Sequence, residues 1–350
     1  MPAQPFHEAK NILVTGAGGY IGSALVRSLA TSSAGQLILL DNSERNLYQI
    51  ELELAAIPNC PPHLPILGDL CDSALLEDLL EKNRPEFVYH AAALKHVPLM
   101  EKNPIAAVRT NAIGTHKLAE YVSRYSVNKL IMISTDKAVN PLSIMGASKR
   151  IAELALLHSN NSGTKTRMKS LRLANVWGST GSVVPLFQQQ ILQEGPVTIT
   201  HQGASRYFLN LSETVDLILA LASLDDAEGV FVPKVGEPVK ITEVARKLIE
   251  TADPSASKAI PIVFTGLRPG EKLTEELISV AETVEATPDS RLLRVLNVRT
   301  PPPDFGAQMR KLAEAVNQHD LAAVFETCSR LVPEYRPSEY LLGSLHPFRA

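Results

Sequence analysis

Two short segments of this 350-residue chain carry side chains suited to acid–base chemistry. Thr135, Asp136 and Lys137 follow one another at the end of an apolar run, and further on Met145 and Lys149 stand four residues apart. That last spacing places both side chains on one face of a helix. A neighbouring hydroxyl, carboxylate and amine can exchange protons with a bound substrate, provided that the amine is neutral whenever it acts as a base. The two segments therefore indicate a catalytic site.

A glycine-rich turn near the start of the chain has the spacing of a dinucleotide-binding fingerprint. Gly16, Gly19 and Gly22 follow the apolar run 11–15 and open a helical pattern over 19–30. The first glycine permits a tight turn, the second lets the backbone approach a pyrophosphate, and the third allows the helix to pack closely on the strand. The helix N-terminus then faces the phosphates. This context predicts a nicotinamide dinucleotide as cofactor.

An acidic residue bears on the choice of dinucleotide. Asp41 closes the second predicted strand, where its carboxylate can hydrogen-bond the adenosine ribose. A carboxylate repels a 2′-phosphate, so Asp41 favours NAD over NADP. Arg45 and Lys95 weaken that preference, and NADP stays an alternative. Asp69, which follows the third predicted strand, suits an adenine contact but fits an ordinary turn equally well.

The elements that would position these residues alternate between short apolar runs and amphipathic stretches. Strands are predicted at 11–15, 36–41, 65–68, 86–90, 129–134 and 169–174, and helices at 19–30, 43–56 (with a serine cap), 73–82, 104–125 and 148–157. This alternation predicts an α/β fold with a Rossmann-type doubly wound parallel sheet. Ligands of such sheets bind at the carboxyl ends of the strands, where both segments above are expected to lie.

The rhythm of strands and helices breaks after Asn175, which predicts a smaller C-terminal substrate-binding lobe. We expect an NAD(P)-binding domain over 10–175, with parts of 200–235 returning to it, and an interleaved lobe over 176–282. Residues 283–350 would form a C-terminal extension. Within that extension, the polar, proline-containing stretch 283–304 is expected to be a surface connector and 305–331 to be helical.

The composition excludes several classes of protein. A net charge of −3 provides no basic excess to neutralise phosphates, so nucleic acid is not expected as a partner. Cys60, Cys71 and Cys328 lack ligand-like spacing and are interpreted as incidental thiols, and we expect no metal site. The run 217–224 is too short to span a membrane, and the stretch 1–10 is too polar for a signal peptide. The sequence therefore predicts a cytoplasmic enzyme.

Eight sequence blocks follow one another in an order that covers nearly the whole chain. They are G-A-G-G-Y-I-G at 16–22, H-A-A-A-L-K-H-V-P-L-M-E at 90–101, T-N-A-I-G-T at 110–115, S-T-D-K-A-V-N-P at 134–141, R-L-A-N-V-W-G-S at 172–179, S-R-Y-F at 205–208, R-P-G-E-K-L at 268–273 and L-V-P-E-Y at 331–335. In combination they resemble the extended short-chain dehydrogenases/reductases. Within that superfamily they are similar to the UDP-N-acetylglucosamine 4,6-dehydratases of capsule and polysaccharide biosynthesis.

The resemblance implies a reaction cycle on a bound nucleotide sugar. Tightly held and recycled NAD would take a hydride from sugar C4, water would leave from C5 and C6, and the hydride would return to C6. The product is a 4-keto-6-deoxy sugar. By the same resemblance Lys137 is the C5 base, Asp136 is the acid for the C6 oxygen, and Thr135 hydrogen-bonds the C4 hydroxyl. Asp136 raises the pKa of Lys137 whereas burial and nearby positive charge lower it, and the sequence leaves that balance open.

Met145 departs from the Tyr-x-x-x-Lys pattern of short-chain dehydrogenases, in which the tyrosine removes the substrate hydroxyl proton and the lysine holds the nicotinamide ribose. A thioether cannot take that proton, so we expect Asp136 to accept it, directly or through Thr135 or water. The resemblance includes a branch with methionine here, often in longer proteins with an N-terminal membrane region, which we expect this chain to lack. That branch generally retains the C5 configuration, which predicts UDP-2-acetamido-2,6-dideoxy-α-D-xylo-hexos-4-ulose as product.

The resemblance also assigns the remaining contacts. Cofactor contacts are expected from Gly16, Gly19, Tyr20, Ile21, Asp41, Asn42, Ser43, Asp69, Leu70, Ala91, Ala92, Lys95, Asn111 and Lys149. UDP-sugar contacts are expected from Lys95, His96, Asn175, Val183, Arg206, Arg268 and Glu271. Arg206 and Arg268 suit a diphosphate because guanidinium groups bind phosphate oxygens bidentately. Glu271 stands close enough to Arg268 to bind the uridine ribose, and His90 is expected to be a packing or substrate-edge residue.

Two other functions stay open. A nucleotide-sugar C4 epimerase would share the fold and cofactor, but it does not need Asp136 and Lys137 and usually keeps the tyrosine. A noncatalytic NAD-binding sensor or scaffold protein would explain Met145 but not the intact Thr135-Asp136-Lys137 segment. We also expect the protein to be a homo-oligomer. The helices predicted at 104–125 and 148–157 would form the dimer face.

Overall fold

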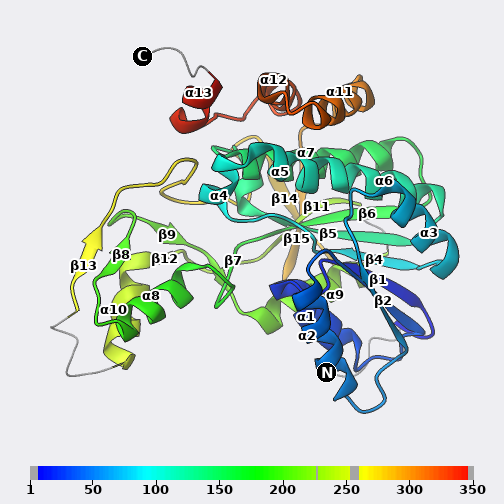
Figure 1. Cartoon of the computed structure of the whole chain (residues 1–350), viewed down its shortest axis with the longest axis horizontal. Coiled ribbons are helices and arrows are strands. Elements are labelled where there is room, and N and C mark those ends of the chain that lie inside the picture. Colours follow the sequence, from blue (N-terminus) through cyan, green and yellow to red (C-terminus); the bar gives the residue numbers. More distant parts are fainter. Residues whose placement is uncertain (1–6, 226–227, 253–259, 346–350) are drawn as a thin grey trace.

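Parallel strands at the centre of the molecule confirm the Rossmann-type α/β fold (Figure 1). The computed structural model describes residues 7–225, 228–252 and 260–345. Residues 1–6, 226–227, 253–259 and 346–350, which belong to the predicted N-terminal stretch, lobe and extension, lie outside these ranges. Within them the main sheet has nine strands in the order β14-β15-β11-β6-β5-β4-β1-β2-β3.

The strands of the main sheet are β1 (Asn11–Thr15), β2 (Gln36–Asp41), β3 (His63–Leu67), β4 (Phe87–His90), β5 (Lys129–Thr135), β6 (Arg167–Leu173), β11 (Gly229–Pro233), β14 (Thr283–Ala286) and β15 (Leu292–Leu296). The strands from β3 to β11 in the sheet order pair in parallel, so their carboxyl ends share one edge. All six strands expected in the first half of the chain are present, with ends shifted by no more than a few residues.

Helices cover both faces of this sheet. They are α1 (Tyr20–Leu29), α2 (Glu44–Ala55), α3 (Ser73–Asn83), α4 (Val97–Lys102), α5 (Pro104–Ala107), α6 (Thr115–Arg124), α7 (Ile144–Asn161) and α9 (Leu211–Ser223). The helix predicted over 104–125 is a succession of α5, a π-helical stretch Val108–Gly114 and α6. The predicted cap of α2 is confirmed, because the Ser43 side chain accepts a hydrogen bond from the Asn46 backbone N–H. Helix α7 begins earlier than expected, where Ser143 caps it.

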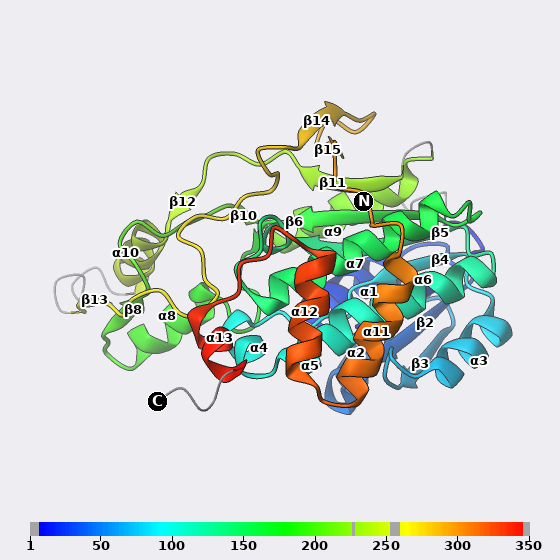
Figure 2. The same ribbon diagram turned by 90° about the horizontal axis from the view of Figure 1, so that it is seen from above.

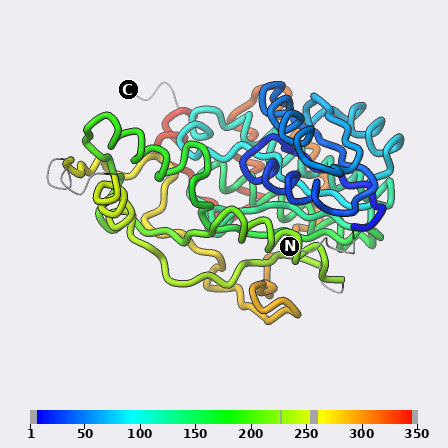
Figure 3. The backbone as a smooth tube through the Cα atoms, turned by 90° about the horizontal axis from the view of Figure 1, so that it is seen from below, coloured from blue at the N-terminus to red at the C-terminus, as the bar shows by residue number. Residues whose placement is uncertain are grey.

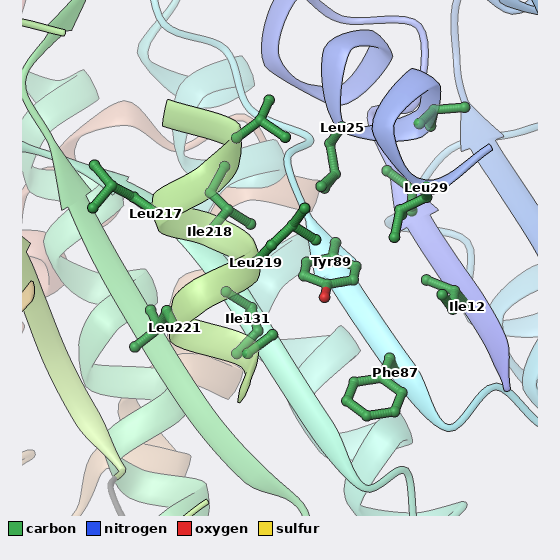
Figure 4. Close-up of a cluster of buried hydrophobic side chains, with 14 of the residues drawn as sticks. Ile12, Leu25, Leu29, Phe87, Tyr89, Ile131, Leu217, Ile218, Leu219 and Leu221 are labelled. Carbon is green, nitrogen blue, oxygen red and sulfur yellow. The ribbon is translucent and has the colours of Figure 1, made fainter. Parts of the chain in front are cut away.

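The largest core cluster lies between α1, α9 and one face of the sheet. Figure 4 shows four α9 side chains, from Leu217 to Leu221, above Ile131 of β5 and the rings of Phe87 and Tyr89 of β4. Each fully buried side chain of this size contributes roughly 1.5–3 kcal/mol of transfer free energy. The apolar run at 217–224 is therefore explained by the core. No helix in the described ranges combines the length and apolarity needed to cross a membrane.

A smaller lobe lies beside the sheet's carboxyl edge, at the left of Figure 1. It contains α8 (Val183–Leu192), α10 (Ile241–Ala252) and the short strands β8 (Val197–Ile199), β9 (Ser205–Arg206), β12 (Val239–Lys240) and β13 (Ile262–Phe264). The two-residue strands β7 (Asn175–Val176) and β10 (Phe208–Leu209) pair where the chain enters the lobe. Phe187, Val197 and Ile249 belong to its separate apolar core. The exact domain limits stay predictions.

The stretch 283–304 is not only the surface connector that we expected. It contains β14 and β15, and β15 pairs antiparallel with β11, so the pair extends the main sheet. Figure 3 shows this pair in orange beside the sheet. The reason is packing, because the apolar strand Leu292–Leu296 buries Leu292 and Val295, and Val295 shares a cluster with Val230 and Val232 of β11.

Two helices in the predicted extension cover the outer face of α7. They are α11 (Phe305–Asn317) and α12 (Leu321–Leu331), which confirm the helical prediction for 305–331, and a short α13 (Glu339–Leu345) follows. Figure 2 shows α11 and α12 lying across α5, α6 and α7. Apolar side chains from both helices share one cluster with Met145 and other residues of α7. The chain's own C-terminal helices thus cover the apolar face of α7, and the expected dimer face on these helices stays a prediction.

Candidate active site

The glycine-rich turn has the close geometry that a dinucleotide requires. Gly16 has a φ of +67°, and a Cβ placed on it would lie 2.6 Å from the Ala92 backbone nitrogen. A Cβ on Gly22 would lie 1.9 Å from the Gly16 carbonyl oxygen. Gly19 is the N-cap of α1, and no side chain caps this helix end. The first backbone N–H groups of α1 are thus available for a phosphate, and Tyr20 and Ile21 are half-buried beside them.

Asp41 joins this turn to the end of β2. Its Oδ2 accepts a hydrogen bond from Gly18 N at 2.9 Å, and its Oδ1 accepts one from Ser43 N at 2.9 Å. Each carboxylate oxygen can accept a further bond, so Asp41 can still bind a ribose. The Ser43 side chain is used in capping α2, whereas Asn42 is exposed.

Asp69 forms an ion pair that the sequence reasoning missed. Its Oδ2 accepts a hydrogen bond from Arg109 Nη2 at 2.9 Å, and its Oδ1 accepts one from Cys71 N at 2.8 Å. Leu70, which stands between Asp69 and Cys71 in the sequence, is buried in the core. The adenine contact of Asp69 stays a prediction.

Asn111 holds a loop in place through both N–H groups of its amide and through its Oδ1. Its amide donates to the Leu94 carbonyl and to Ser148 Oγ, and its Oδ1 accepts from Leu94 N. The side chain is fully buried. Asn111 therefore fixes the loop that begins with the half-buried Ala91 and Ala92, and it ties that loop to α7. The expected cofactor contact of Asn111 stays a prediction.

Thr135, Asp136 and Lys137 lie together at the carboxyl end of β5 and in the single turn of 3₁₀-helix that follows. Thr135 Oγ1 donates to Asp136 Oδ1 at 2.9 Å, and Lys137 Nζ donates to the same oxygen at 2.9 Å. Asp136 is 1% exposed. The hydroxyl, carboxylate and amine thus form one continuous hydrogen-bonded chain.

Two residues from other segments complete what we call the Lys137 cluster: Asp136, Lys137, Asn175 and Glu275. Lys137 Nζ lies 3.3 Å from Asn175 Oδ1 and 3.6 Å from Glu275 Oε1. Burial lowers the pKa of Lys137, but the carboxylates of Asp136 and Glu275 outweigh it, and the pKa is raised overall. The balance that the sequence left open therefore favours a protonated amine in this state. Glu275 was missed, and its only sequence signal is its place just after the R-P-G-E-K-L block.

Met145 and Lys149 lie on α7 with different surroundings. Met145 is buried in the apolar cluster formed with α11 and α12. Lys149 is 4% exposed, and within the described residues its ammonium group makes no hydrogen bond to protein. Burial lowers the pKa of Lys149 to about 8, although Glu153 opposes this. A buried amine without a protein partner is costly and is typical of a ligand-binding position.

Replacing Lys149 with methionine is expected to stabilise the ligand-free protein near pH 7 by about 3 kcal/mol. The folded pKa of about 8 lies below the ordinary 10.5. The unfolded chain therefore binds more protons between these two values, and wild-type stability rises with pH across that window. The gain of the variant should consequently shrink toward pH 10. Urea unfolding of both proteins at several pH values measures this, and a variant less stable than wild type at pH 7 would contradict it.

The predicted UDP-sugar residues fall into two groups. Arg206 donates to the carbonyl oxygens of Ser205, Lys272 and Leu273 at 2.7–2.8 Å, so its guanidinium is largely engaged by backbone. Arg268 is exposed and pairs with Glu271, donating from Nε at 2.9 Å.

The other predicted substrate residues lie near the start of α8 and the loop after β4. His96 packs on Gly181, where an added Cβ would lie 2.4 Å from the ring. Val183 is the first residue of α8. Lys95 is partly exposed; burial and the charge of Lys137 lower its pKa, which indicates that the two amines are close. His90 is fully buried between Thr15 and Thr115 and is a packing residue.

A buried ionic network, which the sequence reasoning missed, lies behind these residues. Glu153 on α7 accepts hydrogen bonds from Ser134 Oγ at 2.6 Å, Arg172 Nε at 2.9 Å and Arg150 Nη1 at 2.8 Å. Arg172 also donates to Glu282 Oε2 at 2.8 Å and to the Leu277 carbonyl at 3.1 Å. Burial raises the pKa of Glu153, but the arginines and Ser134 outweigh it and hold the pKa at about 2.

This network connects the segments that carry the Lys137 cluster. Ser134 directly precedes Thr135, Arg172 lies on β6 just before Asn175, and Leu277 follows Glu275 by two residues. The buried charges thus fix the relative positions of β5, α7, β6 and the loop before β14.

Comparisons with known proteins agree with this geometry. Residues 12–297 match the family model of polysaccharide biosynthesis proteins. The capsular polysaccharide biosynthesis protein CapD of Staphylococcus aureus is 44% identical over 274 residues, covering 78% of this chain but only 46% of CapD. The chain thus spans slightly less than half the length of that relative. A UDP-N-acetylglucosamine 4,6-dehydratase (inverting) of Campylobacter jejuni is 34% identical, covering 77% of this chain and 78% of the relative.

A solved structure is similar over most of the fold. The UDP-glucose 4-epimerase of Thermus thermophilus, in complex with NAD, superposes with a TM-score of 0.63 and 25% identity, covering 77% of this chain and 90% of the epimerase chain. The chain therefore belongs to the polysaccharide biosynthesis protein family, within the nucleotide-sugar dehydratases and epimerases of the short-chain dehydrogenase type.

Proposed function

We propose that this protein is an NAD-dependent UDP-N-acetylglucosamine 4,6-dehydratase of surface glycan biosynthesis. The product would be UDP-4-keto-6-deoxy-N-acetylglucosamine with C5 retained, the D-xylo-hexos-4-ulose. The observation that carries the proposal is the hydrogen-bonded chain from Thr135 through Asp136 to Lys137, at the carboxyl end of β5. A 4-epimerase moves only the C4 hydrogen and has no need of the buried Asp136 paired with Lys137.

The residues of the glycine-rich turn fit a dinucleotide. The close approach of Gly16 to Ala92 and the uncapped start of α1 suit the pyrophosphate, Asp41 the adenosine ribose and Lys149 the nicotinamide ribose. When bound, NAD supplies the acceptor and later the donor of the hydride exchanged with the sugar. We propose NAD rather than NADP because the Asp41 carboxylate would repel a 2′-phosphate.

The chain's own residues would handle the protons. Thr135 would bind the C4 hydroxyl and relay its proton to Asp136 Oδ1 through the 2.9 Å hydrogen bond between Thr135 Oγ1 and that oxygen. This relay would remove the need for a tyrosine at position 145. Asp136 would then give that proton to the departing C6 oxygen. Lys137 would remove the C5 proton, which requires the amine to lose its own proton first. Burial of Asp136 keeps these transfers away from water.

The substrate diphosphate would lie near Arg268, which is exposed and needs only to exchange Glu271 for phosphate oxygens. We keep Lys95, His96, Asn175, Val183 and Arg206 as further candidate contacts. We also propose a homo-oligomer, with an interface that avoids the face covered by α11 and α12.

Proton NMR of the protein with UDP-N-acetylglucosamine and catalytic NAD in D₂O tests the proposal. We expect a new C6 methyl signal, deuterium at C5, and ring couplings of the D-xylo product. The C5-inverted ketosugar, the outcome named for the Campylobacter relative, would overturn the stereochemical part. A C4-inverted sugar without a methyl signal would establish the epimerase instead, and an unchanged spectrum with NAD binding would favour a sensor or scaffold.

A further inference from the structure

Glu275 is a second buried carboxylate beside the proposed C5 base. It is 6% exposed and comes from the loop after the R-P-G-E-K-L block, far from Lys137 in sequence. Its Oε1 lies 3.6 Å from Lys137 Nζ, and the amine thus stands between two carboxylates, Asp136 at 2.9 Å and Glu275. Arg206 Nη2 is 3.9 Å from the same oxygen, too far for a hydrogen bond.

Each of these two carboxylates has a second oxygen, besides the one paired with Lys137, that has no hydrogen-bond partner within the described ranges. Asp136 Oδ2 and Glu275 Oε2 are both buried, and neither has a hydrogen-bond partner among the described residues. Buried polar atoms without partners are rare, since each costs about 1–3 kcal/mol. Each of these two oxygens can therefore take up a proton or accept a hydrogen bond from a hydroxyl of a bound sugar.

We propose that Glu275 takes a proton from Lys137 and so provides the neutral amine that abstracts the C5 proton. This inference rests on the proposed dehydratase function. Asp136 is unsuited to this task because it must receive the C4 hydroxyl proton in the same turnover. The site therefore needs a second acceptor, and Glu275 is the buried carboxylate near Lys137 that is left to serve.

The proton balance closes within these three groups. Lys137 first gives a proton to Glu275, and the neutral amine then removes the C5 proton. The C5 electron pair forms the C5–C6 double bond, and the C6–O bond breaks as Asp136 gives the former C4 hydroxyl proton to the leaving oxygen, releasing water. Once C6 is reduced, Lys137 returns its proton to C5 and Glu275 returns its proton to Lys137.

The test compares Glu275→Gln with Glu276→Gln, a neighbour that is exposed and outside the Lys137 cluster. In Glu275→Gln, turnover is expected to fall by about 100-fold or more, while KM for the UDP-sugar changes by less than about threefold. Oxidation at C4, followed by the near-ultraviolet absorbance of the reduced cofactor, should persist, whereas deuterium exchange at C5 should slow with turnover. Glu276→Gln should match wild type.

Two results would overturn the proposal. One is turnover of Glu275→Gln close to that of wild type, and the other is loss of C4 oxidation together with turnover, which indicates a structural role.

An NMR titration of lysine labelled at Cε gives a readout that does not depend on activity. The pKa of Lys137 should be lower in Glu275→Gln and unchanged in Glu276→Gln. If wild type gives no dehydration product, the proposed function fails by itself. An unchanged pKa of Lys137 in Glu275→Gln refutes the role of Glu275 whether or not wild type is active.

Discussion

Lys137→Ala is expected to lower turnover of UDP-N-acetylglucosamine by about 10³-fold, within the range that a positioned general base contributes. The alanine variant leaves the C5 proton without an acceptor. NAD binding should stay within a few-fold of wild type, because Lys137 pairs with Asp136, Asn175 and Glu275 rather than with the glycine-rich turn. The NMR assay for product and equilibrium dialysis for NAD measure the two quantities.

The matched control is Lys137→Arg. Arginine keeps a positive charge between Asp136 and Glu275 but cannot become neutral at accessible pH. An inactive, folded arginine variant would establish that Lys137 acts as a base. Activity close to wild type in either variant would refute the assignment.

Arg172→Ala is expected to destabilise the fold by about 3–5 kcal/mol, because it leaves Glu153 and Glu282 buried without their main partner. Arg172 is 1% exposed and makes paired hydrogen bonds to both carboxylates. Urea unfolding measures the loss. Arg330→Ala is the control, since Arg330 also pairs at 2.9 Å, with Asp304, but at an exposed position, and should cost about 1 kcal/mol or less.

The stability difference caused by Arg172→Ala should depend on pH. The folded pKa of Glu153 is about 2, below its ordinary value of 4.5. A depressed carboxyl pKa stabilises the fold above the unfolded value, and this contribution is lost as pH falls through 4.5 toward 2. The gap between wild type and variant should therefore narrow in acid. A small gap at pH 7 would show that the network contributes little, and a large gap that stays constant down to pH 3 would contradict the lowered pKa of Glu153.

The sequence predicted what local patterns determine. The glycine spacing at 16–22 requires the tight turn that the structure contains, and the alternation of apolar runs predicted the parallel strands. Thr135, Asp136 and Lys137 are neighbours in sequence, so their contact needed no knowledge of distant segments.

What the sequence did not predict depends on contacts between distant segments. The pKa of Lys137 is raised by Asp136 and by Glu275, and Glu275 reaches the amine only when the loop before β14 folds onto β5. The hydrogen bonds of the Asn111 amide with Leu94 and Ser148 likewise join segments that are separate in the sequence. Strand β15 is a short apolar run, Leu292–Leu296, inside a polar stretch, and its pairing with β11 joins segments that are far apart in the sequence.

The family match ends at residue 297, before α11 and α12 begin. The apolar side of α7, including Met145, is thus completed by residues outside the shared segment. The segment that matches the family and the helices that cover α7 are therefore different parts of the chain. Substitutions within α11 and α12 would affect Asp136 and Lys137 only indirectly, through the apolar cluster that these helices share with α7. We therefore expect changes there to alter the stability of the fold before they alter the proposed reaction.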